Sequence, residues 1–305
     1  MHSDQKIALQ NYIWLILLAA IFGSNFMMTK VAVQALPPMF VVSARLAIAA
    51  CVLGAVMLIA GKRFPPLGKV WWFLLGSAFF GHTLPFSLIS WGQETVDAGL
   101  AAILMATMPL FTLLLAHIFT RDEKPNRYTI LGFALALIGI VVLFGFDKLA
   151  SLADQSLRQY AIMLAAMSYG VNAVITKFLT DLAWQASSTA FMLLAFLTSL
   201  PLLFATTSVA DLQADWNVWA AVLYTGLFPT ALAAIMIIFI VRLTSASFLS
   251  QINFMVPLFG VLFAIIFLGE KLPANAALAL LIILIGVAIA RWRPKRVIVS
   301  INKGG

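Results

Sequence analysis

Long apolar runs, each closed by a short polar stretch, follow one another along nearly the whole chain of 305 residues. A helix of about 20 apolar residues is long enough to cross the hydrocarbon core of a bilayer. Stretches rich in proline, glycine and charge, such as 61–69 and 120–127, separate these runs. The pattern predicts ten membrane-spanning helices, over residues 12–33, 38–60, 71–90, 98–119, 129–146, 160–179, 187–207, 218–241, 248–268 and 276–292.

The composition supports this prediction and indicates the fold class. Hydrophobic residues make up 63% of the chain and charged residues 10%, whereas soluble domains carry roughly a quarter charged residues. Lipid offers backbone groups no hydrogen-bond partner, so we expect an all-α membrane protein. The net charge of +8 does not indicate a nucleic-acid partner, because the Lys and Arg residues lie in loops and the tail, as membrane topology requires.

The distribution of Lys and Arg predicts the orientation, since cytoplasmic loops are enriched in these residues. With a cytoplasmic N-terminus, four of them face outward: Lys30, Lys148, Arg158 and Lys271. Fourteen face the cytoplasm: Lys6, Lys62, Arg63, Lys69, Arg121, Lys124, Arg127, Lys177, Arg242, Arg291, Arg293, Lys295, Arg296 and Lys303. The sequence therefore predicts that both termini are cytoplasmic, in a plasma membrane or a bacterial inner membrane.

A polar pattern occurs twice within the apolar segments. "FGSNFMMTK" at 22–30 and "YGVNAVITK" at 169–177 share an aromatic residue, Gly, Asn, Thr and Lys at matching positions. The same spacing relates further identical pairs, which are Trp72/Trp219, Thr83/Thr230, Glu123/Glu270, Lys124/Lys271 and Gly139/Gly286. A collinear series of this kind indicates that the two halves are structural repeats.

Each repeat contains five predicted spans, an odd number, so the second repeat is expected to be inverted in the membrane relative to the first. Inverted repeats are typical of secondary transporters, whose substrate site lies near the midplane between the halves. The predicted units are an N-terminal segment 1–11, a first repeat 12–146, a linker 147–158, a second repeat 159–293 and a basic tail 294–305.

These motifs resemble a known family. The motif at 22–30 followed by "MPLF" and "EK" within 98–139, and the motif at 169–177 followed by "VPLF" and "EK" within 246–286, are similar to the EamA modules of the drug/metabolite transporter superfamily. The resemblance implies a ten-helix carrier that exports amino acids or other small metabolites, with the aromatic amino-acid exporters as a plausible neighbour. One departure is "TRDEK" in the first copy, where the second has "LGEK".

The acidic residues all fall in loops, tails or at the ends of the predicted spans. A carboxylate buried in the membrane is the usual proton or sodium relay and the usual partner of a cationic drug. Its absence from the spans favours a neutral or zwitterionic substrate, moved without a coupled ion. The sequence also shows no Cys/His cluster with zinc spacing, and we expect neither a metal nor another cofactor.

Polar and aromatic side chains within the spans are candidates for the substrate cavity. His82 lies near the middle of a span, where a histidine either faces a cavity or is bonded within the bundle. The two motif asparagines could contact substrate or bond between helices. Together with aromatic neighbours and two polar residues that have no counterpart in the first half, the candidates are Phe22, Asn25, Phe79, His82, Trp91, Tyr169, Asn172, Gln251 and Asn253.

Further positions are expected to shape or close the pathway. Proline removes a backbone N–H and frees a carbonyl within a helix, which makes Pro85, Pro109, Pro229 and Pro257 candidate kinks or hinges. Arg45, inside the second span, could anchor to a carbonyl or a carboxylate or extend outward to the interface, and a gate or structural role is favoured over substrate binding. Candidate gate or helix-capping residues at the two faces are Lys30, Lys177, Glu123, Glu270 and Lys271.

The sequence thus predicts a transporter of small metabolites that works by alternating access, with amino acids that carry apolar or aromatic side chains as the favoured substrates. A carrier of another metabolite or drug class is the alternative within transport, although a nucleotide-sugar carrier would need more buried cations than Arg45 alone. A membrane enzyme would need clustered Asp and His or a metal site. A membrane scaffold would not need matched amides and prolines in both halves.

Overall fold

A computed structural model describes residues 2–119, 127–144, 154–179 and 182–291. Within these ranges every regular element is a helix, which confirms the all-helical prediction for this part of the chain. Seven helices are long and apolar enough to cross a membrane, and shorter apolar helices cover Arg127–Leu143, Ile252–Leu268 and Ala276–Ala290. These helices follow the predicted apolar runs closely, while the count of ten membrane spans stays a prediction.

The helices of the first half begin with α1 (His2–Val33) and α2 (Pro38–Ile59). The third predicted span is a continuous rod whose centre is π-helical, and the fourth is interrupted at residues 106 and 107. These two spans comprise α3 (Val70–Ala78), η1 (Phe79–Thr83), α4 (Leu84–Gly92), α5 (Ala98–Met105) and α6 (Met108–Phe119), and α7 (Arg127–Phe144) completes the half.

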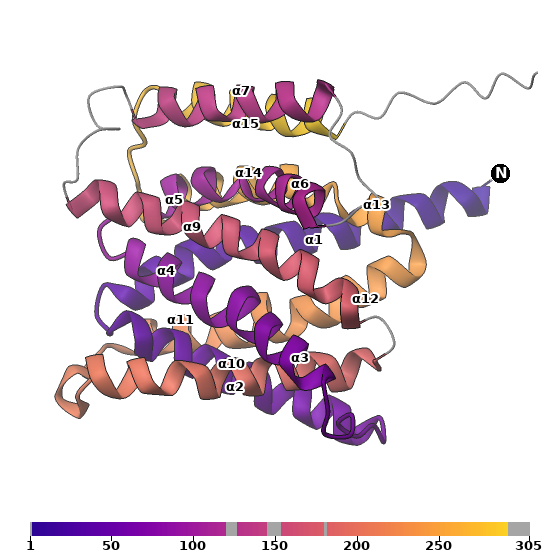
Figure 1. Cartoon of the computed structure of the whole chain (residues 1–305). Helices are drawn as coiled ribbons and strands as arrows, with labels where there is room; N and C mark the ends of the chain where they lie inside the picture. The colour runs from indigo at the N-terminus through magenta and orange to yellow at the C-terminus, as the bar shows by residue number, and fades with distance from the viewer. Residues whose placement is uncertain (1, 120–126, 145–153, 180–181, 292–305) are drawn as a thin grey trace, which may run out of the picture.

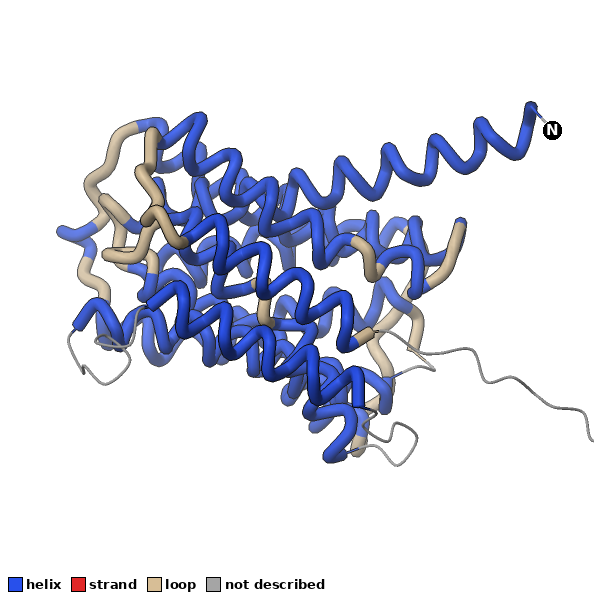
Figure 2. The backbone as a smooth tube through the Cα atoms, turned by 90° about the horizontal axis from the view of Figure 1, so that it is seen from above, coloured by secondary structure: helices blue, strands red, loops and turns tan. Residues whose placement is uncertain are grey.

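The second half has a similar order. It comprises α9 (Asp154–Ile175), η2 (Thr176–Leu179), α10 (Trp184–Thr206), η3 (Val209–Asp211), α11 (Trp216–Gly226), η4 (Leu227–Leu232), α12 (Ala233–Leu243), α13 (Ala246–Leu249), α14 (Ile252–Leu268) and α15 (Ala276–Ala290). A π-helical stretch again forms the centre of the third rod, and a break again precedes the long fourth helix. Loops gather at the two ends of the bundle (Figure 2).

The two halves are interlocked. The first helix of each half packs against the fourth helix of the other, α1 against α14 and α9 against α6. The second helices α2 and α10 pair with one another, and α7 and α15 form a separate pair (Figure 1). Each half therefore supplies equivalent walls to a shared centre.

The motif glycines explain two of these close contacts. A Cβ atom added at Gly23 would lie 2.5 Å from Cβ of Phe259 and 2.9 Å from the backbone nitrogen of Gly260, on α14. A Cβ at Gly170 would lie 3.0 Å from the backbone carbon of Phe111, on α6. Small residues at helix contacts let backbones approach closely in membranes, so this part of the repeated motif encodes the crossed packing of the halves.

Substitution of Gly170 by Val is expected to lower the free energy of unfolding by about 1–3 kcal/mol, because the added carbons must displace the backbone of α6. Thermal unfolding of the purified protein in detergent measures the effect. Gly68→Val is the matched control, since a Cβ there meets nothing within 4 Å. Equal losses in the two variants would contradict the packing role of Gly170.

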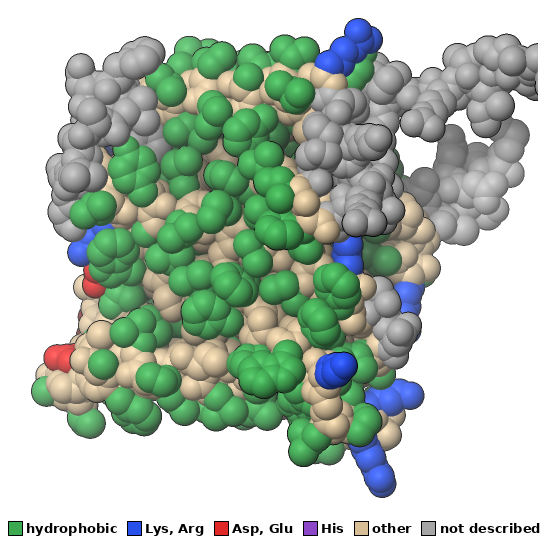
Figure 3. Space-filling view, in the orientation of Figure 1, with side chains coloured by type: hydrophobic (Ala, Val, Ile, Leu, Met, Phe, Trp, Pro, Cys, Tyr) green, Lys and Arg blue, Asp and Glu red, His purple; other side chains and the backbone are tan. Residues whose placement is uncertain are grey.

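Charge is divided between the two ends of the bundle. The acidic side chains that the structure describes all lie at the end where α4 stops and α5 starts: Glu94, Asp97, Asp211, Asp215 and Glu270. The α2–α3 loop at the other end carries Lys62, Arg63 and Lys69. On the face shown in Figure 3, Lys and Arg gather mainly at this second end, and a broad hydrophobic surface separates the two ends. We call them the acidic end and the basic end.

Candidate functional site

Arg45 lies at the junction of the two halves. Its side chain is only 2% exposed, and its Nη2 donates to Asn25 Oδ1 at 3.0 Å and to Thr230 Oγ1 at 3.0 Å. Nε donates to the same threonine oxygen at 3.3 Å, and the guanidinium carbon lies 3.9 Å from the ring centre of Phe86. Helices α1, α2 and α4 of the first half and η4 of the second half thus meet at one cation.

The local structure of η4 holds Thr230 in place as an acceptor. Pro229 has no N–H, so it cannot donate to the carbonyl of Thr225, four residues before it. That carbonyl instead accepts a hydrogen bond from the side chain of Thr230, through Oγ1 at 2.7 Å. The hydroxyl hydrogen is used in this bond. The lone pairs of the oxygen are therefore left to accept from Arg45.

A related arrangement occurs in the first half. In the π-helical register of η1, Leu84 donates its N–H to the carbonyl of Phe79, five residues earlier. Pro85 cannot do the same for Phe80, and Ser168 Oγ of α9 donates to that carbonyl at 2.6 Å. π-Helical turns are frequent at functional sites. Here η1 lies just before the candidate hinge Pro85 and η4 contains the candidate hinge Pro229, and each turn contacts the opposite half.

The other two prolines lie in the fourth helix of each half. Pro109 is the second residue of α6, directly after the break at residues 106 and 107, and Pro257 lies inside α14. Both are buried. The structure therefore associates Pro109 with an interruption of its helix, as a kink would require, while α14 continues through Pro257.

Asn172, His82 and Tyr169 are all half-buried within the bundle. Asn172 Oδ1 accepts from Ser77 Oγ at 2.6 Å, so both motif asparagines use their amide oxygen within the bundle. His82 is half-buried between the rings of Phe86 and Phe191, with centroid distances of 5.8 and 6.1 Å. Its Nδ1 has no hydrogen-bond partner among the described residues. Tyr169 packs against the apolar cluster that contains Phe86.

The remaining cavity candidates are dispersed. Phe22 is half-buried and packs beside α12 and α14, and the amide of Asn253 donates to the carbonyl of Ser250 at 3.1 Å. The rings of Phe79 and Trp91 are each 38% exposed, and Gln251 is exposed at the start of α14. Trp91 lies at the acidic end and Gln251 toward the basic end, so the structure does not bring them together with Arg45.

At the acidic end, the loop between α4 and α5 is held from several directions. Lys30 is 8% exposed, and its Nζ donates to the carbonyls of Gln93, Glu94 and Val96 at 2.8, 3.3 and 3.1 Å. The carboxylate of Glu270 accepts from the backbone nitrogens of Ala98 and Gly99 at 2.7 and 2.9 Å, at the start of α5. A carboxylate is favourable at a helix N-terminus.

Two more side chains support this loop. Gln93 is fully buried, and its Nε2 donates to the carbonyl of Phe26 at 2.9 Å. Arg158 forms an ion pair with Glu94 and donates to the carbonyl of Trp91 at 2.7 Å. We call the groups from Lys30, Gln93, Glu94, Arg158 and Glu270 the end clamp.

The counterparts at the basic end are arranged differently. Lys177, which matches Lys30 in the repeat, is exposed and makes no hydrogen bond to the residues the structure describes. Glu123, the counterpart of Glu270, lies outside the described residues. Lys271 is exposed at the acidic end, and Glu270 binds backbone nitrogens, so the described contacts of Glu270 show it as a helix cap.

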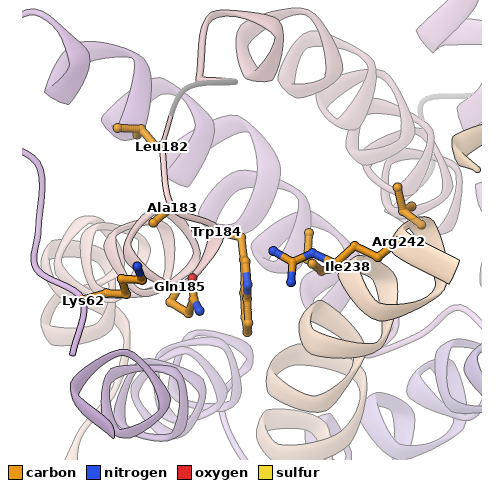
Figure 4. A pocket seen from close by; sticks show the side chains of 8 residues that line it. Lys62, Leu182, Ala183, Trp184, Gln185, Ile238 and Arg242 are labelled. Atoms are coloured by element: carbon orange, nitrogen blue, oxygen red, sulfur yellow. The ribbon is translucent and has the colours of Figure 1, made fainter. Parts of the chain in front are cut away.

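A cavity of about 460 Å³ opens at the basic end. Figure 4 shows the Arg242 side chain extending across it toward Trp184. The cavity lies between the α2–α3 loop, the start of α10 and the end of α12, and its lining comprises Lys62, Leu182, Ala183, Trp184, Gln185, Ile238, Val241 and Arg242.

Several of these contacts were not predicted from the sequence. Gln93, Ser168 and the lining of the cavity carry no pattern that marks them in an apolar chain. For Thr230 a signal did exist, because it directly follows Pro229 and matches Thr83 in the repeat. In the part of the chain that the structure describes, no group of His, Cys, Asp and Glu could hold a metal ion.

Comparison with known proteins identifies a family to which the chain is similar. The model of the EamA-like transporter family matches residues 10–145 and again residues 159–292. The chain is 26% identical over 282 residues to the uncharacterized transporter YoaV of Bacillus subtilis, covering 88% of this chain and 91% of the relative. It is 25% identical over 274 residues to the uncharacterized inner membrane transporter YedA of Escherichia coli K12, covering 88% and 86%.

A solved crystal structure shares the fold. It is similar over 94% of this chain and 97% of that chain, with a TM-score of 0.65 and 18% sequence identity. At this identity the likeness concerns the fold alone.

Proposed function

Because the chain belongs to the EamA-like transporter family, a family of multi-pass membrane transporters, we propose that it exports amino acids with apolar or aromatic side chains by alternating access. The observation that carries this proposal is the polar cluster of Arg45, Asn25 and Thr230, which joins the two halves at a buried point. The cluster offers groups for a polar ligand head, and the surrounding side chains of Phe86 and Tyr169 suit an apolar or aromatic body.

The transport pathway lies between two inverted repeats of five spans each. The family model matches the chain twice, and the crossed packing of α1 on α14 and α9 on α6 is what two equivalent halves would form. Rocking of repeats against each other around a central site is the usual means of alternating access.

The described conformation is closed at the acidic end and accessible at the basic end. Lys30 and Glu270 hold the α4–α5 loop at the acidic end. At the basic end Lys177 is exposed and a cavity of about 460 Å³ opens between the α2–α3 loop, α10 and α12. From the concentration of Lys and Arg at the basic end we infer that this end, and both termini, face the cytoplasm. The protein then takes up its substrate from the cytoplasm through this cavity.

Reconstitution in liposomes tests the proposal. Purified protein is expected to give saturable uptake of radiolabelled phenylalanine, tryptophan or leucine above that of protein-free liposomes. No buried carboxylate is described within the spans, so the rate is expected to be the same with and without a proton gradient. A panel of amines, sugars and other metabolites serves as the comparison, and flux of one of these with no amino-acid flux would assign another substrate class.

A variant of His82 tests whether transport is coupled to protons. If uptake instead follows the proton gradient, His82→Asn is the variant to measure, because this histidine is half-buried within the third rod. Loss of the gradient dependence in that variant would replace the uncoupled mechanism with a proton-coupled one.

A further inference from the structure

We propose that Arg45 binds the carboxylate of the transported molecule, and that the carboxylate, more than the amine, is the group the site recognises. This inference rests on the proposed function and specifies the chemistry of its central site.

The charge of Arg45 is uncompensated in the described bundle. A guanidinium remains protonated in proteins, and a buried charge is costly unless it is paired. Among the described residues, the partners of Arg45 are an amide oxygen, a hydroxyl oxygen and an aromatic ring. These satisfy hydrogen bonds and leave a full positive charge, since the described carboxylates all lie at the acidic end of the bundle.

The guanidinium also retains donors. Its bonds use Nε and Nη2, while Nη1 makes no hydrogen bond to the described residues. A planar guanidinium recognises a carboxylate by parallel N–H bonds, which is the strongest pairing available to it. Both halves contact Arg45, so movement of one half against the other exposes it to a ligand.

The fold does not require an arginine at this place. At the repeat spacing of 147 residues, α10 carries Met192 opposite Arg45 of α2, and at 148 it carries Leu193. Met192 is 4% exposed within the cluster that also contains Leu46 and Phe86. An apolar side chain therefore fills the equivalent packing position, and a costly buried cation is expected only where a function uses it.

The neighbourhood predicts a preference among ligands. Asn25, Tyr169 and Thr230 are neutral, and no described acid lies within the spans to pair with a ligand amine. An acid that lacks the amine is therefore expected to bind at least as well as the amino acid. An amine or amide that lacks the carboxylate is expected to bind about 10- to 100-fold more weakly, the range of a hydrogen bond to a charged group.

Binding to the purified full-length protein in detergent tests this without requiring transport. The probe is 3-phenylpropionate, and 3-phenylpropanamide is its neutral partner of almost the same shape. Microscale thermophoresis or isothermal titration measures each dissociation constant. The acid is expected to bind about 10- to 100-fold more tightly than the amide, and this comparison needs no variant.

Variants of Arg45 then assign the effect to this residue. Arg45→Gln is expected to remove the difference between acid and amide, and Arg45→Lys is expected to keep part of it. Arg291→Gln is the matched control, since Arg291 also donates to a carbonyl, that of Ser250 at 2.9 Å, and lies 5.8 Å from the ring centre of Phe254. That control is expected to retain the full difference.

Equal binding of acid and amide by the native protein, or no binding of either, would overturn the inference. A preference for the acid that survives in Arg45→Gln would overturn it too. The liposome uptake assay distinguishes a failure of this inference from a failure of the proposed function. Amino-acid transport without any preference for a carboxylate would support the proposed function and contradict only the role of Arg45. Carboxylate binding without flux in liposomes would keep the site and remove the transport of these substrates.

Discussion

Replacing Lys30 with methionine is expected to lower transport about 10- to 100-fold. Methionine keeps much of the length of the lysine stem but loses the ammonium group, which donates to the carbonyls of Gln93, Glu94 and Val96. Each hydrogen bond to a charged group is worth about 1.5–3 kcal/mol when its loss leaves a buried group unpaired. Loss of a single such bond is enough for about a tenfold shift between closed and open forms.

Transport falls because the variant no longer closes the acidic end securely while the basic end is accessible. Liposome uptake of a substrate identified for the native protein measures the rate. Labelling of Val96→Cys by a membrane-impermeant maleimide measures the opening directly, because Val96 is only 1% exposed in the clamped loop. The single natural cysteine, Cys51, is exposed and is first replaced by alanine.

Lys69→Met is the control for charge removal, since Lys69 is exposed at the basic end. It is expected to leave both uptake and labelling of residue 96 unchanged. Unchanged uptake and labelling in Lys30→Met would show that the end clamp does not govern closure, and the alternating-access proposal would lose its closed end.

The helices themselves were predictable from the sequence because their cause is local. A run of apolar residues must satisfy its backbone internally in lipid, and only a helix does so within one segment. The predicted run 98–119 has the ends of the observed α5 and α6, and the run 71–90 differs from Val70–Gly92 by only a few residues. The break at residues 106 and 107 lies just before Pro109, a candidate kink in the sequence, but its exact position was not predicted.

Pairing between the halves was less accessible from sequence. The repeated Gly and Asn predicted that the segments 22–30 and 169–177 are structurally equivalent. An apolar helix, however, has no polar face to indicate which neighbouring helix each segment contacts. Gly23 contacts α14 and Gly170 contacts α6, and the three-dimensional structure was needed to show that both contacts cross between halves.

The site shows the same division between local and distant causes. Arg45 was recognised as a buried cation, but its interpretation as a structural anchor did not include the charge balance of its surroundings. Ser168 was missed because its role depends on the Phe80 carbonyl that Pro85 leaves without a donor, in a helix of the other half. A hydroxyl in an apolar run gains meaning only when the acceptor that faces it is known.

Thr230→Val is expected to lower the free energy of unfolding by about 2–4 kcal/mol, the second large effect. Valine has nearly the same shape but provides neither the hydrogen bond to the carbonyl of Thr225 nor the acceptor for Arg45. Neutral hydrogen bonds between membrane helices average about 0.6 kcal/mol, whereas bonds to a charged group are worth about 1.5–3 kcal/mol. The contact with Arg45 therefore decides the magnitude.

The repeat supplies the matched control for this prediction. Thr83 occupies the corresponding place in the first half, and its hydroxyl donates to the carbonyl of Ala195 at 3.0 Å and lies 2.8 Å from the hydroxyl of Thr198. Both partners are neutral, so Thr83→Val is expected to cost only about 0.5–1.5 kcal/mol, and Thr230→Ser is expected to unfold like the native protein. Thermal unfolding in detergent measures the stability of all three variants. If Thr230→Val loses no more stability than Thr83→Val, the hydrogen bond between Thr230 and Arg45 does not stabilise the protein.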